Sequence, residues 1–302
     1  MGAMKKQKSA VIDCADCAAW LEAAKQGAMH LSFLDPPFNQ GKEYRRFDDK
    51  RDDADYWRWM TDILKLMRRA TAEGGWTYFM QREKNAEFVL RALRESGWQF
   101  KNLIVWKKKT SAVPCSAKFG LNYQIIVSAT NGSSPRVFNR LRISPPLPPG
   151  YKFPRENGVY VTDVWDDIRE LTSGYFAGTE AIRTDNGERF HKQQAPLALL
   201  ARIILSSSRP GDTVFDPFAG TGTTLMASQL LGRKGVGVEI DPVNAECIKE
   251  RITEVRQSDI EGICKLRDTY SCTENLSDIW GGKSDIVSAA PAPNADMPLL
   301  TA

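Results

Sequence analysis

Two short segments hold carboxylates beside stiff or glycine-rich turns, and these are the residues best suited to chemistry. In the first, the apolar run 31–34 ends in Asp35-Pro36-Pro37-Phe38. The two prolines have no backbone N–H and fix φ near one value, so the chain leaves the strand stiffly. A carboxylate and an aromatic ring are therefore held in a fixed relation to each other, which suits the positioning of a substrate.

The second segment is a glycine turn between an apolar strand and a helix. Asp216 ends the strand, and Gly220 and Gly222 allow a tight turn whose backbone can approach a ligand closely. Glu239 follows about twenty residues later at the end of another strand, where such folds place a carboxylate that binds ribose hydroxyls. No lysine follows the second glycine, so this is not a phosphate loop of the GxxxxGK[ST] type.

The anion at Asp216 favours an ammonium-bearing ligand over a pyrophosphate. S-adenosyl-L-methionine has a ribose, an amino-acid part and no phosphate, and it is the cofactor we expect. Taken alone, each segment also has a purely structural interpretation. The first would be a polyproline turn with Phe38 in the core, and the second a simple strand-to-helix turn. The glycine turn together with Glu239 favours a nucleoside-containing ligand over a simple turn.

Together the motifs resemble the amino-methylating DNA methyltransferases, which transfer methyl to adenine N6 or cytosine N4. That family pairs a [D/N/S]PP[Y/F/W] tetrapeptide with an FxGxG-type turn, here "DPPF" at 35–38 and "FAGTG" at 218–222. The tetrapeptide comes first and the turn last, an order similar to the permuted group called the β class. The resemblance runs from about Val11 to Val255. "HKQQAPLALLARII" also resembles the family segment HPTQKPLxLLxRxI, with His191, Gln194 and Pro196 matching and Ala195 in place of the lysine.

The resemblance implies a role for each motif. Asp35, Pro36, Pro37 and Phe38 would be catalytic: the Asp35 carboxylate and the Pro36 carbonyl accept the two N–H groups of the target amine, and the Phe38 ring stacks on a flipped base. The implied cofactor-binding residues are Asp16, Asp35, His191, Gln193, Asp216, Phe218, Gly220, Thr221, Gly222, Thr223, Thr224, Glu239 and Ile240.

The aspartate at position 35 favours adenine, because the cytosine enzymes of this family more often carry serine there. Methylation of cytosine N4 stays an alternative, and so does a catalytically silent DNA-binding subunit. A methyltransferase acting on RNA or on a protein glutamine is disfavoured, because those enzymes usually keep the cofactor turn before the tetrapeptide. A nucleotide-dependent dehydrogenase would leave "DPPF" unexplained.

Alternating strand and helix patterns predict an α/β fold: a doubly wound, mostly parallel sheet of the S-adenosylmethionine-dependent methyltransferase type, with seven strands and an inserted target-recognition segment. Apolar periodicity predicts a helix over 52–75 that ends at a glycine pair. We expect a catalytic half over 10–130, a target-recognition region over 131–189, and a cofactor-binding half over 190–270. The composition of 271–302 is typical of a flexible tail.

The charge balance permits a nucleic-acid partner without requiring one, with 41 Lys and Arg against 37 Asp and Glu. We expect double-stranded DNA as the partner. Basic side chains after the tetrapeptide and at 107–118 would contact phosphates, and Arg136, Arg140, Arg142 and Lys152 of the insertion are candidate base readers. The predicted DNA-binding residues are Lys42, Arg45, Arg46, Lys107, Lys108, Lys109, Lys118, Arg136, Arg140, Arg142 and Lys152. One compact recognition segment implies a short site or a homodimer, and a cognate restriction endonuclease is a further expected partner.

Six scattered cysteines and the absence of an apolar run long enough to span a membrane predict a reduced, cytoplasmic protein associated with the nucleoid through DNA, with no membrane partner. Cys14 and Cys17 have zinc-like spacing, but no second pair completes a four-ligand site. We therefore expect no metal, and two buried thiols at a strand end.

Overall fold

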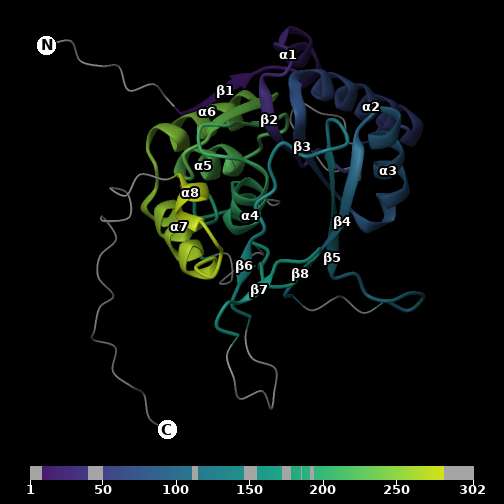
Figure 1. Ribbon diagram of the computed structural model, residues 1–302. Coiled ribbons are helices and arrows are strands. Elements are labelled where there is room, and N and C mark those ends of the chain that lie inside the picture. Colours follow the sequence, from purple (N-terminus) through teal and green to yellow (C-terminus); the bar gives the residue numbers. More distant parts are fainter. Residues whose placement is uncertain are drawn as a thin grey trace, which may run out of the picture.

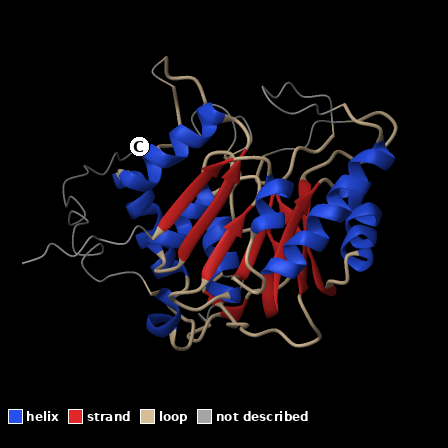
Figure 2. Ribbon diagram, turned by 90° about the horizontal axis from the view of Figure 1, so that it is seen from above, coloured by secondary structure: helices blue, strands red, loops and turns tan. Residues whose placement is uncertain are grey.

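The computed structural model describes residues 9–39, 50–110, 115–145, 155–171, 178–184, 186–190 and 194–281. These residues form three layers, a central sheet with helices on both faces (Figures 1 and 2). Figure 1 shows α1, α2 and α3 on one side of the sheet and α4 to α8 on the other. The predicted α/β class is confirmed.

The sheet of the described residues has eight strands. From edge to edge they are β1 (Ala10–Cys14), β10 (Lys234–Glu239), β9 (Thr213–Asp216), β2 (Met29–Leu34), β3 (Thr71–Gln81), β5 (Tyr123–Thr130), β4 (Gln99–Lys107) and β8 (Val164–Trp165). β1, β10, β9, β2 and β3 are parallel, and β5 runs antiparallel to both β3 and β4. The two-residue β8, from the insertion, is the strand that the sequence did not predict.

The helices cover the sheet with apolar faces. They are α1 (Cys17–Ala23), α2 (Asp53–Ala70), α3 (Ala86–Glu95), preceded by a 3₁₀ turn at Glu83–Asn85, α4 (Leu197–Ser207), α5 (Thr223–Leu230), α6 (Pro242–Thr253), α7 (Gln257–Thr269) and α8 (Leu276–Trp280). One core cluster packs α2 and α3 against the sheet, and a larger one packs α4, α5 and α7 against the other face.

Helix α2 ends earlier than its periodicity predicts. It stops at Ala70, because Thr71 already pairs with Met29 as the first residue of β3. The glycine pair does not end the helix. Gly74 instead has a φ of +70° inside the strand, where a Cβ would lie 2.6 Å from the backbone nitrogen of Arg136. The glycine therefore allows another chain segment to approach the strand closely.

The described parts of the insertion pack on the sheet. The indole N–H of Trp106 in β4 donates to the carbonyl of Ile168 at 3.0 Å. Arg202 of α4, which is buried, binds both carboxylate oxygens of Asp167. The antiparallel pair β6 (Arg142–Ile143) and β7 (Val159–Tyr160) also belongs to this segment. The insertion thus forms part of the cover over β3, β5 and β4.

The packed part of the chain extends past the boundary at residue 270 that the composition suggested. Trp280 in α8 is buried, and its carbonyl accepts a hydrogen bond from buried Arg233 at 3.0 Å. Residues up to Gly281 therefore contribute to the fold. In the described part of the chain, we find no helix long and apolar enough to cross a membrane.

Candidate active site

A pocket opens where three neighbouring parallel strands end. Asp35 follows β2, Asp216 ends β9 and Glu239 ends β10, so the carboxyl ends of these strands bring the three carboxylates to one edge of the sheet. This edge is where open α/β sheets bind ligands. The lining comprises Ala15, Asp16, Cys17, Phe33, Asp35, Pro36, Pro37, Arg51, Trp59, Gln194, Ala195, Asp216, Pro217, Phe218, Ala219, Gly220, Thr221, Thr223, Thr224, Glu239, Ile240, Asp241 and Asn244.

The proline hinge is fixed by two sets of hydrogen bonds. The hydroxyl of Tyr56, on α2, donates to the carbonyl oxygen of Pro37 at 2.7 Å. Asn39 has a φ of +53° and exchanges two hydrogen bonds with the backbone of Arg51, each 2.9 Å. The segment that carries Asp35 is therefore held against the start of α2 as well as by its own prolines.

Asp35, Pro36 and Pro37 line the pocket, whereas Phe38 is buried, with 6% of its surface exposed. In this structure the Phe38 ring therefore lies in the core, which agrees with the interpretation of the tetrapeptide as a polyproline turn. The residues that follow, 40–49, lie outside the described part of the chain. A stacking role for Phe38 stays a prediction.

The glycine turn lies between β9 and α5. Gly220 and Gly222 have φ values of +55° and +73°, which favour glycine, and Gly222 caps α5. A Cβ at Gly222 would also lie 2.8 Å from the side chain of Ile248. Glu239 binds this turn directly: one carboxylate oxygen accepts the Gly220 N–H at 2.9 Å and the other the Asp241 N–H at 3.0 Å.

The two carboxylates nearest the turn are both buried. Burial raises the pKa of Asp216 to about 7, although hydrogen bonds from the Thr224 hydroxyl, at 2.5 Å, and from the Phe218 N–H, at 3.0 Å, favour its charged form. Burial also raises the pKa of Glu239, against hydrogen bonds from Asp241 and Gly220. The carboxylates repel each other, so a cationic ligand group would stabilise both.

Asp16 and Ile240 lie on the pocket wall. The Asp16 carboxylate also caps α1, accepting the N–H groups of Ala18 and Ala19 at 3.0 Å each. The lining also includes Phe218, Thr221, Thr223 and Thr224, whose roles in cofactor binding stay predictions. His191 and Gln193 lie outside the described residues. Gln194, one position further on, is buried and lines the pocket.

An aromatic and cationic wall was missed by the sequence reasoning. The ring of Trp59 meets Phe218 edge-on at 5.8 Å, and the Arg51 guanidinium lies 4.9 Å from the Trp59 ring centre. All three residues line the pocket. Trp59 also packs against the core cluster of Met60, Ile63, Leu64 and Met67, so the helical pattern alone does not mark it as a pocket residue.

Lysines at 107–109 lie where β4 ends, at the same edge as the pocket. Burial lowers the pKa of Lys108, and the charges of Glu170 and Asp35 partly offset this effect, so its ammonium lies within electrostatic reach of Asp35. Glu170, from the insertion, accepts the N–H groups of Lys109 and Thr110 at 2.8 and 2.9 Å. Lys118 is exposed on the loop that follows.

The arginines expected to read bases lie elsewhere. The guanidinium of Arg136 binds Asp212, which precedes β9. The backbone N–H of Arg136 donates to the carbonyl of Gly74, near the start of β3. Both contacts lie at the edge of the sheet opposite the pocket. The guanidinium groups of Arg140 and Arg142 lie over the ring of Tyr160 at 5.2 and 4.2 Å. This placement does not favour base reading, which stays a prediction. Lys42, Arg45, Arg46 and Lys152 lie outside the described residues.

Cys17 is buried, and burial raises the pKa of its thiol to about 12, but Cys14 is exposed, so the expectation of two buried thiols is wrong for Cys14. The strand β1 lies at the edge of the sheet, which leaves its last residue open. Within the described segments, no group of three or more His, Cys, Asp or Glu side chains could hold a metal ion.

Comparison with known proteins gives consistent results. The family model N6_N4_Mtase, described as DNA methylase, matches residues 29–250. The chain is 31% identical over 285 residues to the DNA adenine methyltransferase YhdJ of Escherichia coli (strain K12), covering 87% of this chain and 88% of that protein. It is 26% identical to the Type II methyltransferase M.HpaI of Haemophilus parainfluenzae, covering 88% and 80%. TTHA0409 of Thermus thermophilus, solved with S-adenosyl-L-methionine, has the same fold, with a TM-score of 0.56, 22% identity, and 80% and 93% coverage.

Proposed function

The chain belongs to the DNA methylase family, and we propose that it transfers a methyl group from S-adenosyl-L-methionine to the N6 amine of an adenine in double-stranded DNA. One observation carries the proposal: Asp35, Asp216 and Glu239, far apart in sequence, line one pocket at the ends of adjacent strands. The relative named as an adenine methyltransferase supports the choice of base.

The residues of the pocket fit this cofactor. The Glu239 oxygen that accepts the Gly220 N–H has a second lone pair for a ribose hydroxyl, whereas the other oxygen also accepts the Asn244 amide at 3.5 Å. Phe218 and Ile240 supply apolar surface for a base, and Asp216 supplies a buried anion for an ammonium group. The open Gly220 position, where a Cβ would have only the Phe218 carbonyl as a neighbour at 3.8 Å, leaves room for a ligand beside the turn.

The cofactor supplies an electrophilic methyl group whose sulfur leaves without further activation. The target amine is a poor nucleophile, because its lone pair is delocalised into the ring. Asp35 accepts one of its N–H groups and the Pro36 carbonyl accepts the other, which turns the lone pair toward the methyl carbon. The nitrogen becomes acidic once methylated, and the Asp35 carboxylate that accepts one of its N–H groups would pass the released proton to solvent. The bond from Tyr56 to the Pro37 carbonyl holds the hinge in place during this step.

The amine is hidden in a duplex, so the adenine must leave the stack at a cost of a few kcal/mol. Lysines at 107–109 and 118 lie near the pocket edge and suit phosphate contacts. A Type II relative supports a cognate restriction endonuclease as partner. We extend the proposal to a homodimer that shares recognition, and to a cytoplasmic, nucleoid-associated location.

The test is long-read modification sequencing of DNA from a methylation-free host that expresses wild type, Asp35→Ala or Asp55→Ala. Asp55 is an exposed aspartate on α2 and serves as the matched control. N6-methyladenine at one motif, absent only with Asp35→Ala, supports the proposal. Detection of N4-methylcytosine would keep the mechanism but overturn the choice of adenine as the target base. The absence of any methyl mark from folded wild type would favour the silent-subunit alternative.

A further inference from the structure

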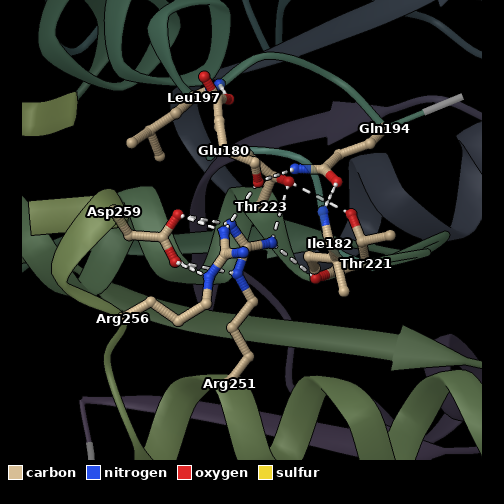
Figure 3. A network of polar contacts seen from close by, with 9 residues as sticks. All are labelled: Glu180, Ile182, Gln194, Leu197, Thr221, Thr223, Arg251, Arg256 and Asp259. Carbon is tan, nitrogen blue, oxygen red and sulfur yellow. Dashed lines mark hydrogen bonds and ion pairs between the residues drawn. The ribbon is translucent and has the colours of Figure 1, made fainter. Parts of the chain in front are cut away.

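A network of charged and polar groups, buried at its centre, joins the glycine turn to the end of the insertion (Figure 3). Its centre is Asp259 on α7, which is 0% exposed. Arg251 of α6 donates to the two carboxylate oxygens at 3.0 and 3.3 Å, and Arg256 donates to the same two oxygens at 2.8 and 3.0 Å. One carboxylate therefore fixes two guanidinium groups.

Arg251 extends the network to the turn. Its Nη1 donates to the carbonyl of Thr221 at 2.8 Å and lies 3.2 Å from the hydroxyl of Thr223. These two residues flank Gly222, and both line the pocket. The guanidinium is therefore bound to the backbone that forms the cofactor site, without itself being part of the pocket wall.

Arg256 extends the network in the other direction. Its Nη2 donates at 2.8 Å to the carbonyl oxygen of Glu180, in the last part of the insertion. The same oxygen accepts the side-chain amide of Gln194 at 3.2 Å, and the Gln194 oxygen accepts the Ile182 N–H at 3.0 Å. Because Gln194 lines the pocket, segment 178–184 is tied to the pocket through two routes that meet on one atom.

The charges in the network are well compensated. Burial alone would raise the pKa of Asp259, but the hydrogen bonds and charges of Arg256 and Arg251 hold it below its ordinary value. The Glu180 carboxyl accepts the N–H of Leu197, the first residue of α4, at 2.5 Å. A buried ion network often stabilises a fold no more than apolar residues of similar size would. Its placement between two functional segments suggests a positioning role.

We propose that this network couples the cofactor site to the recognition insertion, so that cofactor binding orders segment 178–184 and DNA held by the insertion strengthens cofactor binding. Arg256 is the positioning residue, since it alone joins Asp259 to the Glu180 carbonyl among the hydrogen bonds of the described residues. This inference rests on the proposed function. Coupling between two ligands is reciprocal, so it can be measured from either side.

The test compares hydrogen–deuterium exchange of the full chain with and without S-adenosyl-L-methionine. In wild type we expect the cofactor to slow exchange in both the turn 217–224 and the segment 178–184, the latter by about fivefold or more. In Arg256→Gln the turn stays protected, because Arg251 and Asp259 still hold it. The protection of 178–184 falls to what the hydrogen bonds of Gln194 to Glu180 and Ile182 maintain. Arg267→Gln, an exposed arginine on the same helix, is the matched control and should behave as wild type.

Equal protection of 178–184 in Arg256→Gln and wild type would overturn the coupling and leave the proposed function intact. If the cofactor binds to wild type but slows exchange only in the turn, the coupling is likewise overturned and the proposed function stays intact. Failure of folded wild type to bind the cofactor in calorimetry would overturn both. If Arg256→Gln does not fold, Arg256→Lys gives the same comparison, because one ammonium keeps the charge beside Asp259 but lacks the fork that reaches two partners.

Discussion

The carboxylate of Glu239 and the backbone N–H of Gly220 are joined by a 2.9 Å hydrogen bond, which ties the end of β10 to the glycine turn. The acid proposed to bind a ribose therefore also shapes the glycine turn, which we propose contacts the rest of the cofactor. Its other oxygen accepts the N–H of Asp241, the residue that caps α6. A substitution at Glu239 acts on ligand contacts and on the backbone of the site together.

Replacing this acid should weaken cofactor binding more than a surface change on the neighbouring helix. Glu239→Gln keeps one acceptor oxygen but loses the charge and the second acceptor, so we expect the Kd for S-adenosyl-L-methionine to rise about tenfold or more, or ~1.4 kcal/mol. Titration calorimetry measures this, with exposed Glu246→Gln on α6 as the control. An unchanged Kd in Glu239→Gln would remove Glu239 from the binding site.

Cofactor affinity should depend on pH through Asp216, whose pKa is about 7 in the free protein. Below that pH the carboxyl is neutral and attracts the cationic cofactor less, so the Kd should rise as pH falls from about 8 to about 6. The pH dependence should flatten in Asp216→Asn. Calorimetry across this range measures both, and the same slope in the variant would assign the dependence to another group.

The raised pKa of Asp216 also predicts a cost in stability. The folded state keeps a proton that the unfolded state, with a pKa of 3.8, has already lost, so the contribution of Asp216 to the free energy of unfolding falls as pH rises from about 4 to about 7. Asp216→Asn should therefore raise the melting temperature of the cofactor-free protein above about pH 7 while weakening cofactor binding. A lower melting temperature would contradict this.

The parts of the site that sequence predicts best are those set by local pattern. The DPPF and glycine-turn motifs singled out Asp35, Asp216 and Glu239 at the ends of apolar strands, and the structure shows that these strands are parallel and end at one edge of the sheet. The parts it missed depend on partners far along the chain. Arg136 is a residue type that often reads bases, but its guanidinium binds Asp212, 76 positions away. This contact lies at the edge of the sheet opposite the pocket.

The same reason explains the errors in the fold. The helical periodicity of the sequence continues past Ala70, but Thr71 pairs with Met29 as the first residue of β3. Strand pairing thus overrides local helix propensity at this point. The composition of 271–302 is typical of a flexible tail, yet the buried Trp280 packs α8 against the core. The link between Gln194 and the insertion could not be predicted, because it depends on a hydrogen bond from the Ile182 N–H that no sequence periodicity indicates.

Lysines near the pocket edge should contribute to DNA affinity through phosphates. Lys109→Gln and Lys118→Gln should each weaken DNA binding similarly for specific and unrelated duplexes, and each should reduce the slope of log K against log salt by about one. Fluorescence anisotropy at several salt concentrations measures the slope, with exposed Lys65→Gln on α2 as the control. A loss confined to the specific duplex would assign these lysines to base reading instead.

Removing the Asp35 carboxylate should affect turnover far more than cofactor binding. Asp35→Asn leaves a side chain of the same shape that can still accept one hydrogen bond, but its neutral oxygen is a weaker acceptor for the amine. We expect kcat to fall by about a hundredfold or more, while the Kd of the cofactor changes by less than about threefold. Single-turnover methyl transfer measures the chemical step, and near-wild-type rates would exclude Asp35 from catalysis.

Tyr56 offers a sharper test of the stiff hinge, because its hydroxyl reaches the carbonyl of Pro37 and not the substrate. Tyr56→Phe removes this 2.7 Å hydrogen bond and the weaker one from Gln81 at 3.3 Å, and keeps the buried ring in place. If the hinge must hold Asp35 in register, kcat should fall by about tenfold, or ~1.4 kcal/mol, with the KM for DNA and cofactor little changed. A purely structural role would instead lower the melting temperature and the active fraction while leaving the rate per active molecule as in wild type. Active-site titration separates these outcomes, and an unchanged rate per active molecule would show that the prolines alone fix the geometry.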